Sequence, residues 1–172
     1  MDGLIAQGLE AHGGVFQNVR LFLQVREGVH AAVGEDNHPP QGGDLIEHAV
    51  GGQAAGAQAV LVSHNIVACL DADYPASLSP AVHALLRDRL GFDGVIMTDD
   101  LAMQAVTDFT GNENAAVLAV QAGNDLIISS DFVTQYHAVL DAVKNGTLRK
   151  NDIEQAAQRV ILWKIQLGLI SF

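Results

Sequence analysis

The chain has 172 residues, of which 49% are hydrophobic, enough for one globular domain with a hydrophobic core. Its 20 acidic and nine basic residues give a formal charge of -11 without a basic cluster, which argues against nucleic acid or an anionic membrane surface as a partner. No apolar run approaches the ~20 residues that cross a bilayer, the first residues do not resemble a secretory signal, and the single Cys69 excludes an internal disulfide, so we expect a cytoplasmic protein.

Residues 1–53 are predicted to form an irregular segment rich in glycine and histidine. Residues 1–56 hold 11 of the 17 glycines and four of the seven histidines. The stretch 34–44 is typical of a loop, because its Pro and Gly residues break both helices and strands. The apolar residues of 19–25 fit either a strand or a helical turn, and the order of the whole segment stays open. Its histidines lack the regular spacing of metal ligands, so no metal site is predicted.

From residue 54 the pattern becomes regular and begins with a strand and a helix. Residues 57–64 contain the apolar run AVLV, typical of a strand buried on both faces, and end in His64. Ser79 and Pro80 predict a helix start, with Ser as the N-cap and Pro at the first helical position. Gly91 predicts the helix end. Four apolar residues share one face of this helix: Val82, Leu85, Leu86 and Leu90.

Two further strand–helix pairs and one more helix follow. The predicted strands cover 94–98 and 126–130, and the helices cover 113–122 and 132–143. Asn151 and Glu154, three residues apart, predict the start of the last helix as a variant of the capping box. Buried strands that alternate with helices are typical of an α/β fold, a parallel sheet with right-handed crossovers. The pattern alone leaves open whether the sheet is doubly wound or closed into a barrel.

Two carboxylates, Asp99 and Asp100, stand at the end of the predicted strand 94–98. In parallel α/β folds the carboxyl ends of the strands open onto the ligand-binding face, so we expect these side chains to be functional. The alternative is that either one caps the following helix, and for Asp100 we favour a structural role. His64 ends its strand on the same predicted face and is a candidate ligand-binding residue. The alternative is a histidine that bonds to the local backbone.

Several segments between residues 54 and 172 resemble one known family. The longest and most specific reads LGFDGVIMTDDLAM over residues 90–103. Shorter segments resemble the same family, and they cover residues 62–64, 74–80, 85–87, 122–127 and 159–164. Together they resemble glycoside hydrolase family 3, and most closely its bacterial β-N-acetylhexosaminidases, including those of peptidoglycan recycling. The resemblance covers roughly two thirds of the chain.

The resemblance implies both a fold and a reaction. The family's catalytic domain is a (β/α)8 barrel of the TIM type, so the three strand–helix units would be the last three of that barrel. It also implies a retaining hydrolase of β-linked N-acetylhexosaminides that needs no cofactor. Asp99, the first carboxylate of the motif, would be the nucleophile that forms a glycosyl-enzyme, which water then hydrolyses. His64, Asp100 and Met103 would line the sugar site, although Met103 fits a helix core equally well.

The general acid/base of the family has no clear counterpart. In the hexosaminidases it resembles an Asp-x-His dyad preceded by a Lys-His-Phe-Pro-Gly-His-Gly segment, and this sequence lacks that segment. Asp36 and His38 have the spacing of the dyad without its flanks, and His38 lies 26 residues before His64. Asp36 and His38 are therefore candidate acid/base residues. The alternative is an ordinary polar loop.

The chain is short for the implied fold. A closed (β/α)8 barrel takes ~250 residues and at least ~200, whereas residues 54–172 number 119. We therefore expect a truncated barrel whose unpaired strand edges favour self-association. Two other hypotheses stay open: a catalytically inactive barrel remnant, and a flavodoxin-like α/β domain that binds a small molecule.

Overall fold

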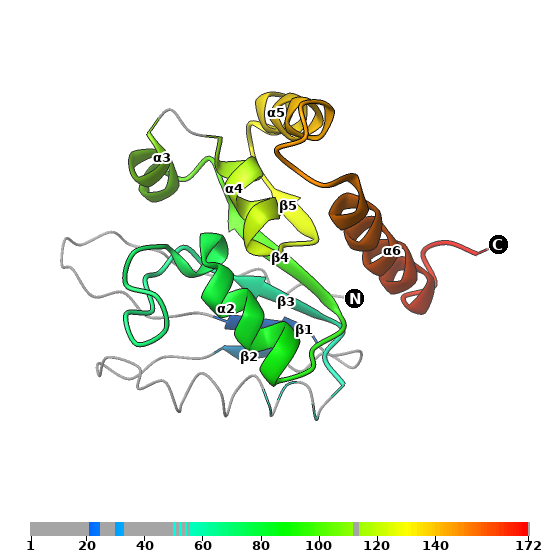
Figure 1. Ribbon diagram of the computed structural model, residues 1–172. Coiled ribbons are helices and arrows are strands. Elements are labelled where there is room, and N and C mark those ends of the chain that lie inside the picture. The colour runs from blue at the N-terminus through cyan, green and yellow to red at the C-terminus, as the bar shows by residue number, and fades with distance from the viewer. Residues whose placement is uncertain are drawn as a thin grey trace.

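The computed structural model describes residues 21–24, 30–32, 50, 52, 54, 56–111 and 114–171 (Figure 1). They form an α/β structure with a five-stranded sheet in the order β2-β1-β3-β4-β5. The strands are β1 (Leu21–Gln24), β2 (His30–Ala32), β3 (Ala59–Val62), β4 (Val95–Asp100) and β5 (Leu126–Ile128). β3, β4 and β5 are parallel, and β1 is antiparallel to both of its neighbours. The predicted α/β class and its three parallel strands are confirmed.

The described strands do not form a closed barrel. β2 and β5 lie at the two edges of the sheet, and no pairing joins them among the described residues. β1 and β2 come from the segment predicted to be irregular. Residues 19–25 were predicted as either a strand or a helical turn, and the described part of this stretch, 21–24, is a strand. β1 runs antiparallel to β3, whereas the strands of a (β/α)8 barrel are all parallel. The barrel closure that the resemblance implies is therefore not confirmed.

Helices follow each of the three parallel strands. In Figure 1, α2 and α4 lie in front of the sheet, and α5 and α6 lie at its upper and right borders. The four predicted helices are present with slightly shifted ends, whereas η1 and α3 were not predicted. None of the described helices is long and apolar enough to cross a membrane. The bounds are η1 (Ala76–Leu78), α2 (Pro80–Ala84), η2 (Leu85–Arg89), α3 (Gln104–Thr110), α4 (Ala115–Ala122), α5 (Phe132–Lys144) and α6 (Lys150–Gln166).

The start of α2 is as the sequence predicted. Ser79 is the N-cap, its Oγ accepts a hydrogen bond from the Val82 N–H at 3.2 Å, and Pro80 occupies the first helical position. The same hydroxyl donates to Asp71 Oδ2 at 2.6 Å. A capping side chain of this kind stabilises a helix by about 1 kcal/mol. The cap therefore fixes where the chain turns from the loop after β3 into the helix.

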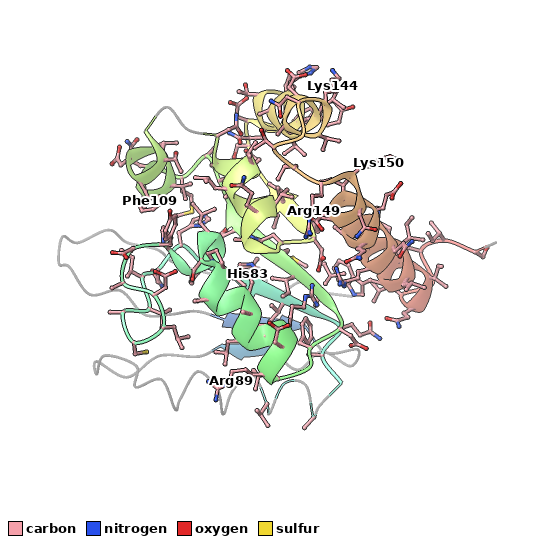
Figure 2. All side chains as sticks on the ribbon, viewed as in Figure 1. His83, Arg89, Phe109, Lys144, Arg149 and Lys150 are labelled. Carbon is pink, nitrogen blue, oxygen red and sulfur yellow. The ribbon has the colours of Figure 1, made fainter. Side chains whose placement is uncertain are left out.

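The predicted cap of the last helix is wrong. α6 begins at Lys150 with Arg149 as its N-cap, so Asn151 lies within the first turn, and no side chain caps the helix. The acidic side chains pair with basic neighbours instead: Asp152 accepts from Arg149 at 2.9 Å, and Glu154 Oε1 lies 2.8 Å from Lys150 Nζ. Figure 2 shows Arg149 and Lys150 where α6 begins.

Two buried clusters hold the helices on the sheet. The first joins β3 and β4 to α2 and η2, and includes Val60, Val62, Val82, Leu85, Leu86, Phe92 and Ile96. The second packs α4 against η1 and α3, and contains Leu78, Leu101, Val106, Ala115, Ala116 and Ala119. A fully buried large aliphatic side chain stabilises the fold by about 1.5–3 kcal/mol. The first cluster includes Ile96 of β4 and the second includes Leu101, just after this strand, so buried residues hold β4 both within the strand and beyond its carboxyl end.

Candidate active site

Polar side chains gather at the carboxyl ends of the three parallel strands. Because these strands run in the same direction, their carboxyl ends meet at one edge of the sheet. His64 lies two residues after β3, Asp99 and Asp100 are the last residues of β4, and Ser130 lies two residues after β5. The sequence predicted a strand that stops before the two carboxylates, whereas both belong to β4. The structure thus places three predicted site residues at the same edge.

Asp99 is the penultimate residue of β4 and is half-buried. Its Oδ1 accepts a hydrogen bond from the Asp100 N–H at 2.8 Å, which fixes the orientation of the carboxylate. The preceding Thr98 is fully buried, and its Oγ1 accepts from the Ile128 N–H at 3.1 Å, so β5 anchors the strand beneath Asp99. Among the described residues, no other hydrogen bond to this carboxylate is found. Oδ1 is therefore the carboxylate oxygen that the main chain holds in place.

Asp100 uses both of its carboxylate oxygens in contacts with the protein. Oδ1 accepts from the N–H groups of Ala102 and Ser130, each at 2.9 Å, and Oδ2 accepts from the Ser130 hydroxyl. These bonds, the one from the Ser130 hydroxyl foremost, hold the pKa of Asp100 below its ordinary value. The N-cap of α3 is Met103, and no side chain caps that helix, so neither aspartate is the helix cap of the alternative interpretation. Asp100 instead ties the end of β4 to the turn after β5.

His64 makes hydrogen bonds through both ring nitrogens. Its Nε2 lies 3.0 Å from the Asp100 main-chain oxygen, and its Nδ1 lies 2.7 Å from Ser77 Oγ. A carbonyl oxygen only accepts, so Nε2 carries the proton and donates, and in the neutral ring Nδ1 accepts from the Ser77 hydroxyl. Burial lowers the pKa of His64, against the opposing effects of the Asp100 carbonyl and of the Asp99 and Asp100 charges. The ring is thus neutral near pH 7.

The remaining predicted site residues differ in what the structure shows of them. Met103 has 39% of its surface exposed, and its N–H donates to the Asp100 main-chain oxygen at 3.1 Å. Met103 therefore does not occupy the helix core that was the alternative interpretation, and its contact with a sugar stays a prediction. Asp36 and His38 lie outside the described residues, so their role as an acid/base dyad also stays a prediction.

Sequence reasoning missed two residues of the site, Ser77 and Ser130. Ser77 is fully buried, and its main-chain oxygen accepts from Asn124 Nδ2 at 2.7 Å while its hydroxyl contacts His64. Ser130 contacts Asp100 from the turn after β5. The sequence did contain a hint of each residue. Ser77 lies in the segment 74–80, which resembles the family, and Ser130 is a polar residue at the end of a predicted buried strand. Which partners they meet depends on strand order, which their local sequence does not contain.

A second polar cluster lies at the amino ends of the strands, away from Asp99. The Asp125 side chain, 2% exposed, accepts from Arg87, from Arg159 at 2.9 Å and from the Ile96 N–H at 2.9 Å. Arg87 also donates to two main-chain oxygens just before β4, each at 2.7 Å. Residues at the amino ends of parallel strands serve stability rather than chemistry. We therefore assign this cluster to the fold.

The described residues offer no evident metal centre. Within the part of the chain that the structure describes, no three His, Cys, Asp or Glu side chains gather where they could hold a metal ion. The chemistry available at the strand ends is that of the Asp99 carboxylate, oriented by the Asp100 N–H, on the same edge of the sheet as the neutral His64 imidazole. Such a carboxylate can act as a nucleophile or stabilise a positive charge on a bound substrate.

Sequence comparisons point to one family. Residues 36–162 match the family model described as Glycosyl hydrolase family 3 N terminal domain. The chain is 36% identical to "Beta-hexosaminidase LpqI" of Mycobacterium tuberculosis over 117 residues, which are 61% of this chain and 29% of that protein. It is 29% identical to "Beta-hexosaminidase" of Tolumonas auensis over 149 residues, which are 84% of this chain and 43% of that protein. The chain thus spans less than half the length of either relative.

A comparison with solved structures agrees with the sequences. The β-N-acetylhexosaminidase of Beutenbergia cavernae is 31% identical, with a TM-score of 0.63, over 76% of this chain and 40% of that one. The similarity therefore extends from the motif around Asp99 to the arrangement of the elements that carry it.

Proposed function

Because the chain belongs to glycosyl hydrolase family 3, we propose that it carries the nucleophile of a retaining hydrolase of β-linked N-acetylhexosaminides, and that Asp99 is this nucleophile. One observation supports the proposal above all: the Asp99 carboxylate ends β4 at the edge where the parallel strands open, with one oxygen held by the Asp100 N–H. The names of the relatives favour N-acetylhexosaminides as the substrate class. Fragments of peptidoglycan contain such sugars and are the substrates that we expect first.

The proposed reaction has two displacement steps at the anomeric carbon. In the first, Asp99 Oδ2 attacks this carbon, the bond to the glycosidic oxygen breaks, and its electron pair leaves with that oxygen. In the second, water attacks the anomeric carbon, loses a proton, and the Asp99 carboxylate is released. The first step requires a proton donor when the leaving group is an ordinary sugar alcohol. Asp36 and His38 are our candidates for that donor.

An activated substrate tests the nucleophile independently of the proton donor. The 2,4-dinitrophenyl β-glycoside of N-acetylglucosamine releases a phenolate that needs no protonation. We expect a burst of phenolate equal to the protein concentration, followed by slow turnover, and no burst from Asp99→Ala. A burst that survives in Asp99→Ala would contradict the assignment. If neither protein releases phenolate above the rate of spontaneous hydrolysis, the result supports the alternative of a catalytically inactive barrel remnant.

We also propose that the chain self-associates through the unpaired edge of its sheet. β5 is an edge strand among the described residues, and Ile128 on it is 37% exposed. Exposed strand edges with apolar side chains favour pairing with another chain. The net charge of -11 opposes the approach of two copies, so we expect the association to strengthen as the salt concentration rises.

A further inference from the structure

We propose that His64, oriented by Ser77, is the positioning residue of the nucleophile, and that it holds the main chain that follows Asp99 rather than transferring a proton. The inference rests on the proposed function, because it assigns a role within the same site. It gives His64 a task different from the sugar contact predicted from the sequence.

Both nitrogens of the His64 ring are already engaged with the protein. Nε2 donates to the Asp100 main-chain oxygen at 3.0 Å, and Nδ1 lies 2.7 Å from the Ser77 hydroxyl. The same Asp100 oxygen accepts from the Met103 N–H at 3.1 Å, so the turn after β4 and the imidazole share one acceptor. A proton donor to a glycosidic oxygen needs an N–H that faces the substrate. His64 has none to offer.

Ser77 is itself held rigidly, which gives the imidazole a fixed support. Ser77 is fully buried, its N–H donates to the Ser63 oxygen at 3.1 Å, and its own main-chain oxygen accepts from Asn124 Nδ2 at 2.7 Å. A continuous series of hydrogen bonds thus runs from Asn124, after α4, through Ser77 and His64 to the end of β4. The Ser77 hydroxyl favours the tautomer with the proton on Nε2, because it can donate to Nδ1.

The contact reaches Asp99 through residue 100. The Asp100 N–H donates to Asp99 Oδ1, its main-chain oxygen accepts from His64, and its carboxylate accepts from Ser130. Residue 100 is therefore held on three sides, and a shift of its main chain would rotate the carboxylate that it orients. A nucleophile must meet the anomeric carbon at the correct distance and angle, and a displacement of about 1 Å in such a site can cost about 100-fold in rate.

Kinetics of the glycosyl-enzyme step test the inference with two replacements of His64. His64→Phe keeps a ring without a donor, whereas His64→Gln places an amide N–H near the position of Nε2. With the dinitrophenyl glycoside of N-acetylglucosamine, we expect His64→Phe to slow the burst by about 100-fold with a half-saturating concentration changed only a few-fold. His64→Gln should recover a substantial part of the rate. The matched control is His137→Gln, an exposed histidine on α5.

Two kinetic results would overturn the inference: an unchanged burst rate in His64→Phe, or a His64→Gln variant as slow as His64→Phe at equal thermal stability. A wild-type protein that releases no phenolate above the rate of spontaneous hydrolysis would instead contradict the proposed function. The arrangement of the imidazole is tested separately by nitrogen-15 NMR of the folded protein. We expect a single Nε2–H tautomer that becomes a mixture in Ser77→Ala. A wild-type ring protonated on Nδ1 alone would overturn the inference whatever the activity.

Discussion

Adjacent aspartates at the end of β4 have opposite environments. Asp100 receives hydrogen bonds on both carboxylate oxygens, and these draw its pKa down. Within the part of the chain that the structure describes, Asp99 receives one, from its neighbour's N–H. The family resemblance implies that Asp99 is the nucleophile, and for Asp100 the sequence favoured a structural role; both assignments stay predictions. Ser130, 30 residues further along the chain, is the partner that distinguishes Asp100, and a local pattern cannot identify such a partner.

His83 makes the stability of the fold depend on pH. It lies on α2 (Figure 2), is 2% exposed, and its Nδ1 lies 2.8 Å from the Ser79 main-chain oxygen. Burial, the largest effect, lowers its pKa below the ordinary 6.5. Below pH 6.5 the unfolded chain therefore binds a proton that the folded ring does not, so the free energy of unfolding falls as the pH falls toward the lower folded pKa. Within this window the slope approaches about 1.4 kcal/mol per pH unit.

Urea unfolding at about pH 7 and about pH 5 measures this loss of stability. We expect the difference between the two pH values to shrink in His83→Phe, which has no proton to bind. The exposed His137 supplies the control, because His137→Gln should leave the wild-type difference in place. His64 contributes in the same direction, since burial lowers its pKa as well. A His83→Phe variant with the full wild-type difference would show that this histidine is not the source.

The Asp125 carboxylate connects four elements of the fold. Asp125 lies just before β5 and contacts residues of η2, β4 and α6. Removal of one partner from a buried ion pair leaves the other charges unpaired and typically costs about 3–5 kcal/mol. We expect Asp125→Ala to lower the free energy of unfolding by this amount, because Arg87 and Arg159 both lose their partner. Chemical denaturation compares it with Asp141→Ala, which removes an exposed pair with Lys144 and should cost less than about 1 kcal/mol. Equal losses in the two variants would contradict this view of Asp125.

Some helices and strands could be predicted from the local sequence, and others could not. The start of α2 was predictable because its cap is local: Ser79 bonds to the N–H three residues later. α3 was missed because Met103 supplies no capping side chain and only Val106 in the helix is buried, so no apolar stripe marks it. β1 was ambiguous because its pairing with β3 lies nearly 40 residues away in the sequence. Contacts between distant segments decided these cases.

At the scale of the whole molecule, several apolar surfaces lack cover within the described residues. α6 buries none of its residues, and on α5 Phe132 and Tyr136 are 69% and 61% exposed. Among the described strands the sheet ends at β5, and the match spans less than half the length of either relative. The apolar pattern of the sequence could not reveal these exposed surfaces, because it predicts that the apolar face of each helix is buried.

Sedimentation over a range of protein concentrations tests self-association through β5. We expect the mean mass to rise with concentration in the wild type and to rise much less in Ile128→Lys, because a lysine on an edge strand opposes pairing. Ile170→Lys is the matched control, since Ile170 is 39% exposed and lies outside the strands. If both variants associate as the wild type does, another surface is responsible.

The central claim is that Asp99 bonds covalently to a sugar, and peptide mapping by mass spectrometry after brief reaction with the dinitrophenyl glycoside tests it most directly. We expect one N-acetylhexosamine residue per chain, attached to the peptide that contains Asp99 and absent from Asp99→Ala. Attachment to a different carboxylate, or an equal yield in Asp99→Ala, would contradict the account.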